Sequence, residues 1–204
     1  MTNPPILIET MYLPPVGVLA AMVRAGVVYI EAHENYQKRG YRNRCEIGSA
    51  NGRMRLTVPL RKGKNEQQPI RNVRLAYDEP WRTQHWTAIR SAYGRAPFFE
   101  YYADEWEQRL RADHATLFDY NFQLLRALLD DLGLPIMLRT TDKYDRQATN
   151  FLDLRNSIRP VSLLKLPYRP YPQVFAERFG FQPQLSGLDL LFCMGPEAAK
   201  YLHP

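Results

Sequence analysis

The feature that most constrains the fold lies in the first 32 residues, where two short apolar segments flank a helical one. "ILIET" (6–10) and "VVYIEA" (27–32) are rich in β-branched residues, which is typical of buried strands. Between them, Pro14 and Pro15 suit a helix start and Gly26 suits its end. A strand, a helix and a strand in this order predict a βαβ unit with two parallel strands and a right-handed crossover.

The next segment has the pattern of an antiparallel hairpin. "YRNRCEIG" and "RMRLTVPL" flank the turn dipeptide Asn51-Gly52, which tolerates the backbone angles of a tight turn. Alternation along the second arm places Arg53 and Arg55 on the face opposite Leu56. The register between the two arms is not given by the sequence. A further strand is predicted over 70–77.

From Pro80 the apolar spacing becomes helical, and three helices are predicted over 80–94, 97–112 and 113–133. The third has Asp113 as its expected N-cap and Gly133 as its stop. A strand over 135–144 follows, and beyond it a proline-rich segment ends in an amphipathic helix.

The predicted fold class is α/β: an N-terminal βαβ unit in a mixed sheet with an antiparallel hairpin, a helical cap region and a proline-rich C-terminal arm. We expect residues 1–145 to form the α/β body, with the cap at 80–133, and 146–204 to form the arm, packed on the same domain. The arm can wrap this body or a neighbouring copy, so a homo-oligomer through the arm stays an open alternative.

Several features favour a cytoplasmic protein. The chain has no apolar window of about 18 residues, so no membrane span is expected. Its start lacks a basic region followed by an apolar stretch, so no secretory signal is expected. Cys45 and Cys193 lie far apart and form neither a disulfide framework nor a metal-ligand spacing. The sequence identifies no metal site and leaves the cofactor unknown.

The positive charge of the chain is concentrated in one region. Residues 37–74 carry eleven basic and two acidic side chains, whereas the rest of the chain is net negative. A solvated hairpin, a small anionic ligand such as a sugar nucleotide, and, ranked last, a nucleic acid would each account for this. The triplet Arg42-Asn43-Arg44 would place both arginines on one strand face, about 7 Å apart, where their planar groups could clamp a phosphate.

Polar side chains follow both strands of the predicted βαβ unit. Ligands of open α/β sheets bind beyond the carboxyl ends of the strands. Glu9, Glu31 and His33 are therefore candidate acid–base residues, while Tyr12 and Asn35 are candidate ligand contacts. Solvated loop residues, or a Mg²⁺ site at the second strand end, are the alternatives. No catalytic signature motif decides between these interpretations.

An ordered set of motifs between residues 6 and 142 resembles the WbqC-like protein family. The motifs are, in order, "YLPPVG", "YRNRC", "LTVPL", "WRTQHW", "YGRAPFF", "FDYNFQLLRALLDDLG" and "RTT". Members of that family often accompany genes for O-antigen and other surface polysaccharides. The resemblance therefore implies sugar modification or transfer on a nucleotide-activated substrate.

The chain departs from the family pattern at two places. Ile8, Glu9 and Thr10 stand where the family typically has a His-Gln-Pro stretch, so a catalytic role of that His would not carry over. Glu31 and Glu34 are the nearest acids to the family's double Asp. The "ENYQKRGYRNRC" segment is similar to a divergent branch associated with Bacteroidetes-type sequences.

Two functional hypotheses follow. In the first, the protein is a transferase acting on a nucleotide-linked sugar in cell-surface polysaccharide (O-antigen) biosynthesis. Arg42 and Arg44 would then bind the phosphates, joined by Arg53 or Arg55 if the register allows, and Asn43 would be a further ligand contact. In the second, the protein is a non-catalytic binding or scaffold protein for polysaccharide-assembly enzymes, with the C-terminal arm as its docking segment.

Overall fold

The N-terminal βαβ unit is present as predicted. The computed structural model describes residues 4–61, 67–158 and 166–203. Strand β1 (Ile6–Glu9) and strand β2 (Val27–Glu31) pair in parallel, joined by helix α1 (Val16–Ala25). Gly26 ends this helix with a φ of 68°, a left-handed conformation that glycine adopts without steric cost.

The main sheet has the order β5-β2-β1-β6, and its described strands are all parallel. Strand β5 (Met137–Thr140) lies beside β2 and confirms the strand predicted after the helices. Strand β6 (Leu152–Asp153) lies beside β1 and was not predicted, because two residues are too few to show a period. The C-terminal part of the chain therefore contributes a strand to the sheet.

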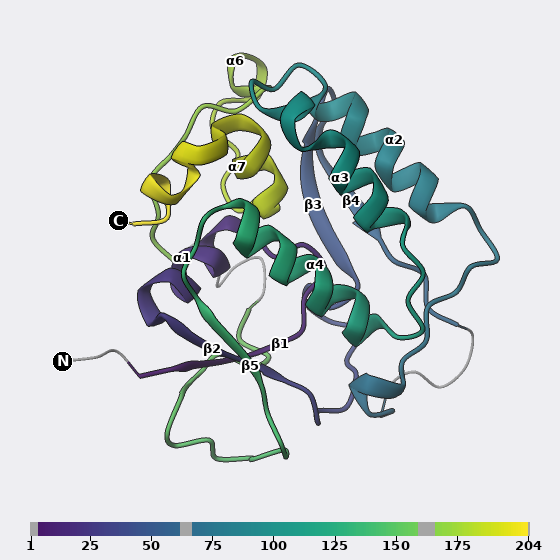
Figure 1. Cartoon of the computed structure of the whole chain (residues 1–204), viewed down its shortest axis with the longest axis vertical. Helices are drawn as coiled ribbons and strands as arrows, with labels where there is room; N and C mark the ends of the chain where they lie inside the picture. Colours follow the sequence, from purple (N-terminus) through teal and green to yellow (C-terminus); the bar gives the residue numbers. More distant parts are fainter. Residues whose placement is uncertain (1–3, 62–66, 159–165, 204) are drawn as a thin grey trace.

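The hairpin forms a second sheet of its own. Strand β3 (Arg44–Ser49) pairs antiparallel with β4 (Gly52–Thr57), and Figure 1 shows them beside α2 and α3, away from the parallel strands. Gly52 has a φ of 96°, so it supplies the positive angle that the tight turn requires. The α/β prediction is thus confirmed, with parallel and antiparallel strands divided between two sheets.

Three local predictions are wrong. Residues 41–43 form a turn instead of extending β3, so Arg42 and Arg44 do not share a strand face. Segment 70–77 holds a 3₁₀ turn (Ile70–Asn72) and isolated bridges instead of a regular strand. The N-cap of the third helix is Thr116, whose hydroxyl accepts a hydrogen bond from the backbone N–H of Asp119, and not Asp113.

Helices α2 (Trp81–Tyr93), α3 (Phe99–Arg111) and α4 (Leu117–Asp131) form the predicted helical region. The C-terminal segment adds α6 (Ala176–Phe179), α7 (Gly187–Met194) and a 3₁₀ turn (Gly195–Tyr201). Gly187 lets α7 approach closely, since a Cβ there would lie 2.5 Å from Leu19 and 2.8 Å from Leu128. Helix α7 is therefore part of the core, packed between α1 and α4 (Figure 1).

The boundary expected near residue 145 and the homo-oligomer through the arm stay predictions. Most of the polar loop expected at 62–68, and the part of the arm at 159–165, lie outside the described residues. Among the described residues, no helix combines the length and apolar character needed to cross a membrane. The cytoplasmic location also stays a prediction.

Leu124 tests the packing of α4. Its side chain is 2% exposed, so Leu124→Ala removes buried apolar atoms and leaves a cavity. We expect the variant to lose about 2 to 5 kcal/mol of unfolding free energy in urea. The neighbouring Gln123→Ala, on the exposed face, should stay within about 0.5 kcal/mol of wild type. Similar losses in both variants would show that α4 does not pack by this face.

Candidate functional site

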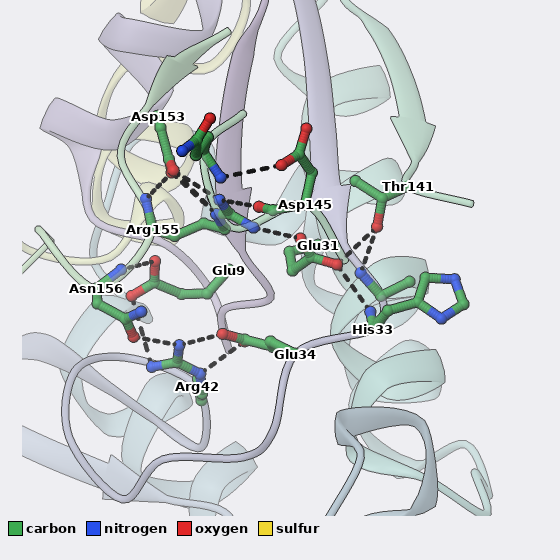
Figure 2. A network of polar contacts seen from close by, with 12 residues as sticks. Glu9, Glu31, His33, Glu34, Arg42, Thr141, Asp145, Asp153, Arg155 and Asn156 are labelled. Carbon is green, nitrogen blue, oxygen red and sulfur yellow. Dashed lines mark hydrogen bonds and ion pairs between the residues drawn. The ribbon is translucent and has the colours of Figure 1, made fainter. Parts of the chain in front are cut away.

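Charged side chains converge at the carboxyl ends of the parallel strands. Glu9 ends β1 and Glu31 ends β2, and the two residues are direct neighbours in the strand register. Asp153 ends β6 on the other side of β1, and Arg155 follows it. Figure 2 shows these groups, with Arg42 entering from the loop before the hairpin, as one network. We call it the edge network: Glu9, Glu31, Glu34, Arg42, Asp153, Arg155 and Asn156.

Arg155 holds Glu31 at the centre of the sheet edge. Its Nη1 donates to Glu31 Oε2 at 2.7 Å, and its other nitrogens donate to the Asp153 carboxylate. The second oxygen of Glu31 accepts from the hydroxyl of Thr141 and from the backbone N–H of His33, both at 2.8 Å. Hydrogen bonds to Asp153 raise the pKa of the Arg155 guanidinium. Glu31 is fully buried, and both of its carboxylate oxygens accept hydrogen bonds from these partners.

Arg42 forms the second ion pair of the edge network. Its Nε and Nη2 donate to the two oxygens of Glu34 at 2.8 and 2.6 Å, which is the bidentate geometry of a strong pair. Nη2 also donates to Asn156 Oδ1 at 2.8 Å. Only 2% of the Arg42 surface is exposed. The guanidinium expected to bind an external phosphate is therefore bound inside the protein.

Glu9 is the carboxylate of the edge network that forms no hydrogen bond with an arginine of that network. Its Oε2 accepts from the backbone N–H of Asn156 at 2.9 Å, while Oε1 has no hydrogen-bond partner among the described residues. Arg42 Nη1 lies 3.6 Å from Oε1, close enough for attraction but too far for a hydrogen bond. Burial raises the pKa of Glu9, and the attraction of Arg42 offsets this only in part.

The raised pKa of Glu9 links its proton to folding. The folded protein binds this proton more tightly than the unfolded chain, whose carboxyl has the ordinary pKa of 4.5. Ionisation of Glu9 therefore lowers the free energy of unfolding as the pH rises above 4.5. A carboxyl that readily holds a proton in this range can serve as a general acid or base.

The space beside Glu9 is closed. Gln37, Arg39, Gly40 and Ile158 lie over the carboxyl, and about 0 Å³ of volume is open to a water molecule. The Glu9 carboxyl is therefore not accessible to a substrate in this conformation.

Two other predicted site residues do not join the edge network through their side chains. His33 is exposed, and its ring points away from the acids in Figure 2, while only its backbone N–H reaches Glu31. Asn35 is exposed, and its backbone bridges to Pro69. The structure therefore brings Glu9 and Glu31 together but leaves the imidazole outside.

Tyr12 does not face a ligand crevice. Its side chain is 0% exposed and stacks on Tyr120 within the core. Its hydroxyl lies 2.9 Å from Nδ1 of His85. Burial lowers the pKa of His85 to about 4, so this imidazole is neutral near pH 7. The pair satisfies two buried polar groups and fixes the first-strand loop against α2 and α4.

A second polar feature lies on the hairpin. The register pairs Glu46 with Arg55 and Arg44 with Thr57, so the basic residues of both arms share one face. A cleft of about 370 Å³ opens there, lined by Tyr36, Lys38, Asn43, Arg44, Arg55, Thr57, Val58, Pro59 and Leu60. We call it the hairpin cleft. Asn43 donates to the Val58 carbonyl at 3.0 Å and so extends the hairpin at this edge.

Arg155 and Asn156 were missed by sequence reasoning. They lie after Asp145, where the pattern weakens, and their partners Glu31 and Glu9 are 124 and 147 positions away. The apolar–polar alternation of "FLDLRN" (151–156) was the one signal that could have indicated a strand end here. Among residues 4–61, 67–158 and 166–203, no group of three His, Cys, Asp or Glu side chains is placed to hold a metal ion.

Comparison with known proteins agrees with the ordered motifs. The sequence model of the WbqC-like protein family matches residues 10–164. This chain belongs to the WbqC-like protein family. It is also 29% identical over 228 aligned residues to "Uncharacterized protein Rv1507c" of Mycobacterium tuberculosis, with 96% of each chain covered. No solved structure matches the chain.

The family match includes most of the edge network. Glu31, Glu34, Arg42 and Arg155 lie within the matched residues, whereas Glu9 immediately precedes them. The resemblance to the WbqC-like family is thus confirmed, while the Bacteroidetes-type branch stays a prediction.

Truncation of Arg42 should lower the free energy of unfolding much more than truncation of Arg44. Arg42→Ala leaves Glu34 buried without its counter-charge, and we expect a loss of about 3 to 5 kcal/mol in urea unfolding. Arg44→Ala removes one hydrogen bond, from Nε to the Gly40 carbonyl, and should cost about 1 kcal/mol. Equal losses, or an Arg42→Ala loss below about 1 kcal/mol, would show that the Arg42–Glu34 pair does not hold the fold.

Proposed function

We propose that the protein binds a nucleotide-linked sugar through its phosphates in the hairpin cleft and transfers the sugar to an acceptor. The observation that carries this proposal is the convergence of Arg44 and Arg55 on one cleft of about 370 Å³. Ligand sites of proteins typically have volumes of about 300 to 1,000 Å³. The cleft is therefore large enough for the phosphate-bearing part of such a ligand.

Arg44 is suited to bind a phosphate. Its Nε is fixed by the Gly40 carbonyl at 2.7 Å, and no hydrogen bond or ion pair among the described residues uses Nη1 or Nη2. Its guanidinium is thus oriented while two nitrogens remain available to an anion. Arg55 makes one exposed ion pair with Glu46, at 3.3 Å, which water and salt weaken and an incoming phosphate can replace.

One loop connects the hairpin cleft to the edge network. Tyr36, Lys38 and Asn43 line the cleft. Gln37, Arg39, Gly40 and Arg42, which lie between them in the chain, cover Glu9 on the other side. The segment 36–44 is therefore a shared wall. An anion that pulls on this wall from the cleft can uncover the Glu9 carboxyl.

Glu9 would then act as the general base. An ionised Glu9 takes the proton from the acceptor hydroxyl as its oxygen bonds to the sugar carbon, and the bond from that carbon to the phosphate oxygen breaks. The electron pair of the broken bond stays on the phosphate, where Arg44 and Arg55 stabilise the added negative charge. The role in surface polysaccharide assembly rests on the family resemblance alone.

A non-catalytic binding protein is the second candidate. The closed space beside Glu9 and the full pairing of Glu31 favour it, because both are typical of ion pairs that hold a fold. The hairpin cleft needs no loop movement to bind an anion. In that case the protein would bind a nucleotide-linked sugar, or present it to a partner, without transferring it.

Truncating both cleft arginines tests the proposal. Uridine diphosphate glucose and pyrophosphate serve as the first probes in calorimetric titration. Each lost charge-assisted bond is expected to cost about 1.5 to 3 kcal/mol, so Arg44→Ala/Arg55→Ala should weaken binding at least tenfold. Higher salt should weaken wild-type binding in the same direction.

The matched control is Arg126→Ala/Arg146→Ala, which removes two exposed arginines away from the cleft. It should bind like wild type. Equal affinity of the cleft variant and wild type would refute the anion site, as would a failure of wild type to bind either probe. Glu9→Gln then separates the two candidates. With a sugar acceptor present, a transferase should stop releasing the nucleotide in this variant, whereas a binding protein should bind uridine diphosphate glucose with unchanged affinity.

A further inference from the structure

A second cavity, unrelated to the hairpin cleft, lies where the C-terminal segment crosses the end of α2. It has a volume of about 750 Å³. Pro172, Val174 and Phe175 of the C-terminal segment form one wall, while Ala92 and Pro97 form the opposite side. At the top of the view in Figure 1, this segment and α6 lie next to the connection between α2 and α3. The walls are thus mainly apolar.

An adjoining cavity extends this space along α2. Its volume is about 530 Å³, and it shares Ala50, Ser91 and Ala92 with the first cavity. Met54, which is 39% exposed, lines its far part. The residues that line both cavities are small, and a flexible methionine adapts to varied apolar ligands. We call the two adjoining cavities the α2 groove.

Two arginines stand at one end of the α2 groove. Arg90 and Arg95 both line the larger cavity and are exposed, and neither guanidinium makes an ion pair or a hydrogen bond among the described residues. Arg90 lies in the last turn of α2, where positive charge complements the helix dipole. Arg95 follows the end of α2, in the connection to α3, so the helix dipole does not explain a positive charge at this position.

We propose that the α2 groove binds a single-chain amphiphile, with its phosphate or carboxylate head group on Arg90 and Arg95 and its apolar chain along α2. The two guanidiniums supply the bidentate donors that such head groups prefer. The apolar walls of the two cavities supply contact for a chain, since burial of apolar surface drives its binding. This site shares no lining residue with the hairpin cleft and does not depend on the proposed transferase activity.

Four probes distinguish the parts of the ligand. Dodecyl phosphate and dodecanoate carry a chain and an anionic head, dodecyl maltoside carries a chain and a neutral head, and inorganic phosphate carries no chain. We expect both anionic amphiphiles, each below its micelle concentration, to bind at least about tenfold more tightly than the other two in calorimetric titration. The tighter of the two identifies the head group as phosphate or carboxylate.

Two variants locate the site. Arg90→Ala/Arg95→Ala should weaken the binding of dodecyl phosphate at least about tenfold. Arg126→Ala/Arg146→Ala leaves the groove intact and should bind it like wild type. Ser91→Trp places a large ring at an exposed position between the two cavities and should also block the chain. Melting temperatures near that of wild type confirm that the variants fold.

Three results would overturn the proposal. The first is that neither anionic amphiphile binds below its micelle concentration, because binding to micelles alone indicates a general affinity for surfaces. The second is that Arg90→Ala/Arg95→Ala binds dodecyl phosphate as tightly as wild type. The third is that Ser91→Trp leaves the affinity unchanged.

Discussion

The pairing of buried charges at the carboxyl edge of the parallel sheet is the interaction on which the rest of the structure depends. Removing an ion from water costs several kcal/mol, and this cost is offset only when partners with good geometry surround it. Arg42 and Arg155 meet that condition for Glu34 and Glu31. Arg155 thereby joins the C-terminal segment to β2, and Arg42 joins the loop before the hairpin to Asn156. Segments more than a hundred positions apart are held by these contacts.

The same pairing separates structural charge from charge that is available for function. Both carboxylate oxygens of Glu31 and of Glu34 accept hydrogen bonds. Glu9, in contrast, keeps one oxygen without a hydrogen bond among the described residues. On the other side of segment 36–44, Arg44 keeps two nitrogens unused. An acid that can hold a proton and a cation that can hold a phosphate are therefore divided by a single layer of chain.

How much the sequence could predict depended on the range of each interaction. The βαβ unit follows from two β-branched apolar runs around a helix, and the hairpin follows from alternation and the turn at Asn51-Gly52. The strand-end rule placed Glu9 beside Glu31, as the register shows. The burial of Arg42 was not predicted, because the sequence does not show that the loop folds Arg42 back onto Glu34 or that Glu9 lies beside them. The direction of the His33 ring is likewise set by tertiary packing.

The titration of Glu9 tests this account most directly. Carboxyl-carbon NMR of the glutamate side chains, with Glu9→Gln to assign the resonance, gives the pKa of this group in the folded protein. We expect a midpoint above the ordinary value of 4.5, because burial outweighs the attraction of Arg42 at 3.6 Å. A midpoint at or below 4.5 would contradict it, because the attraction of Arg42 would then outweigh the effect of burial.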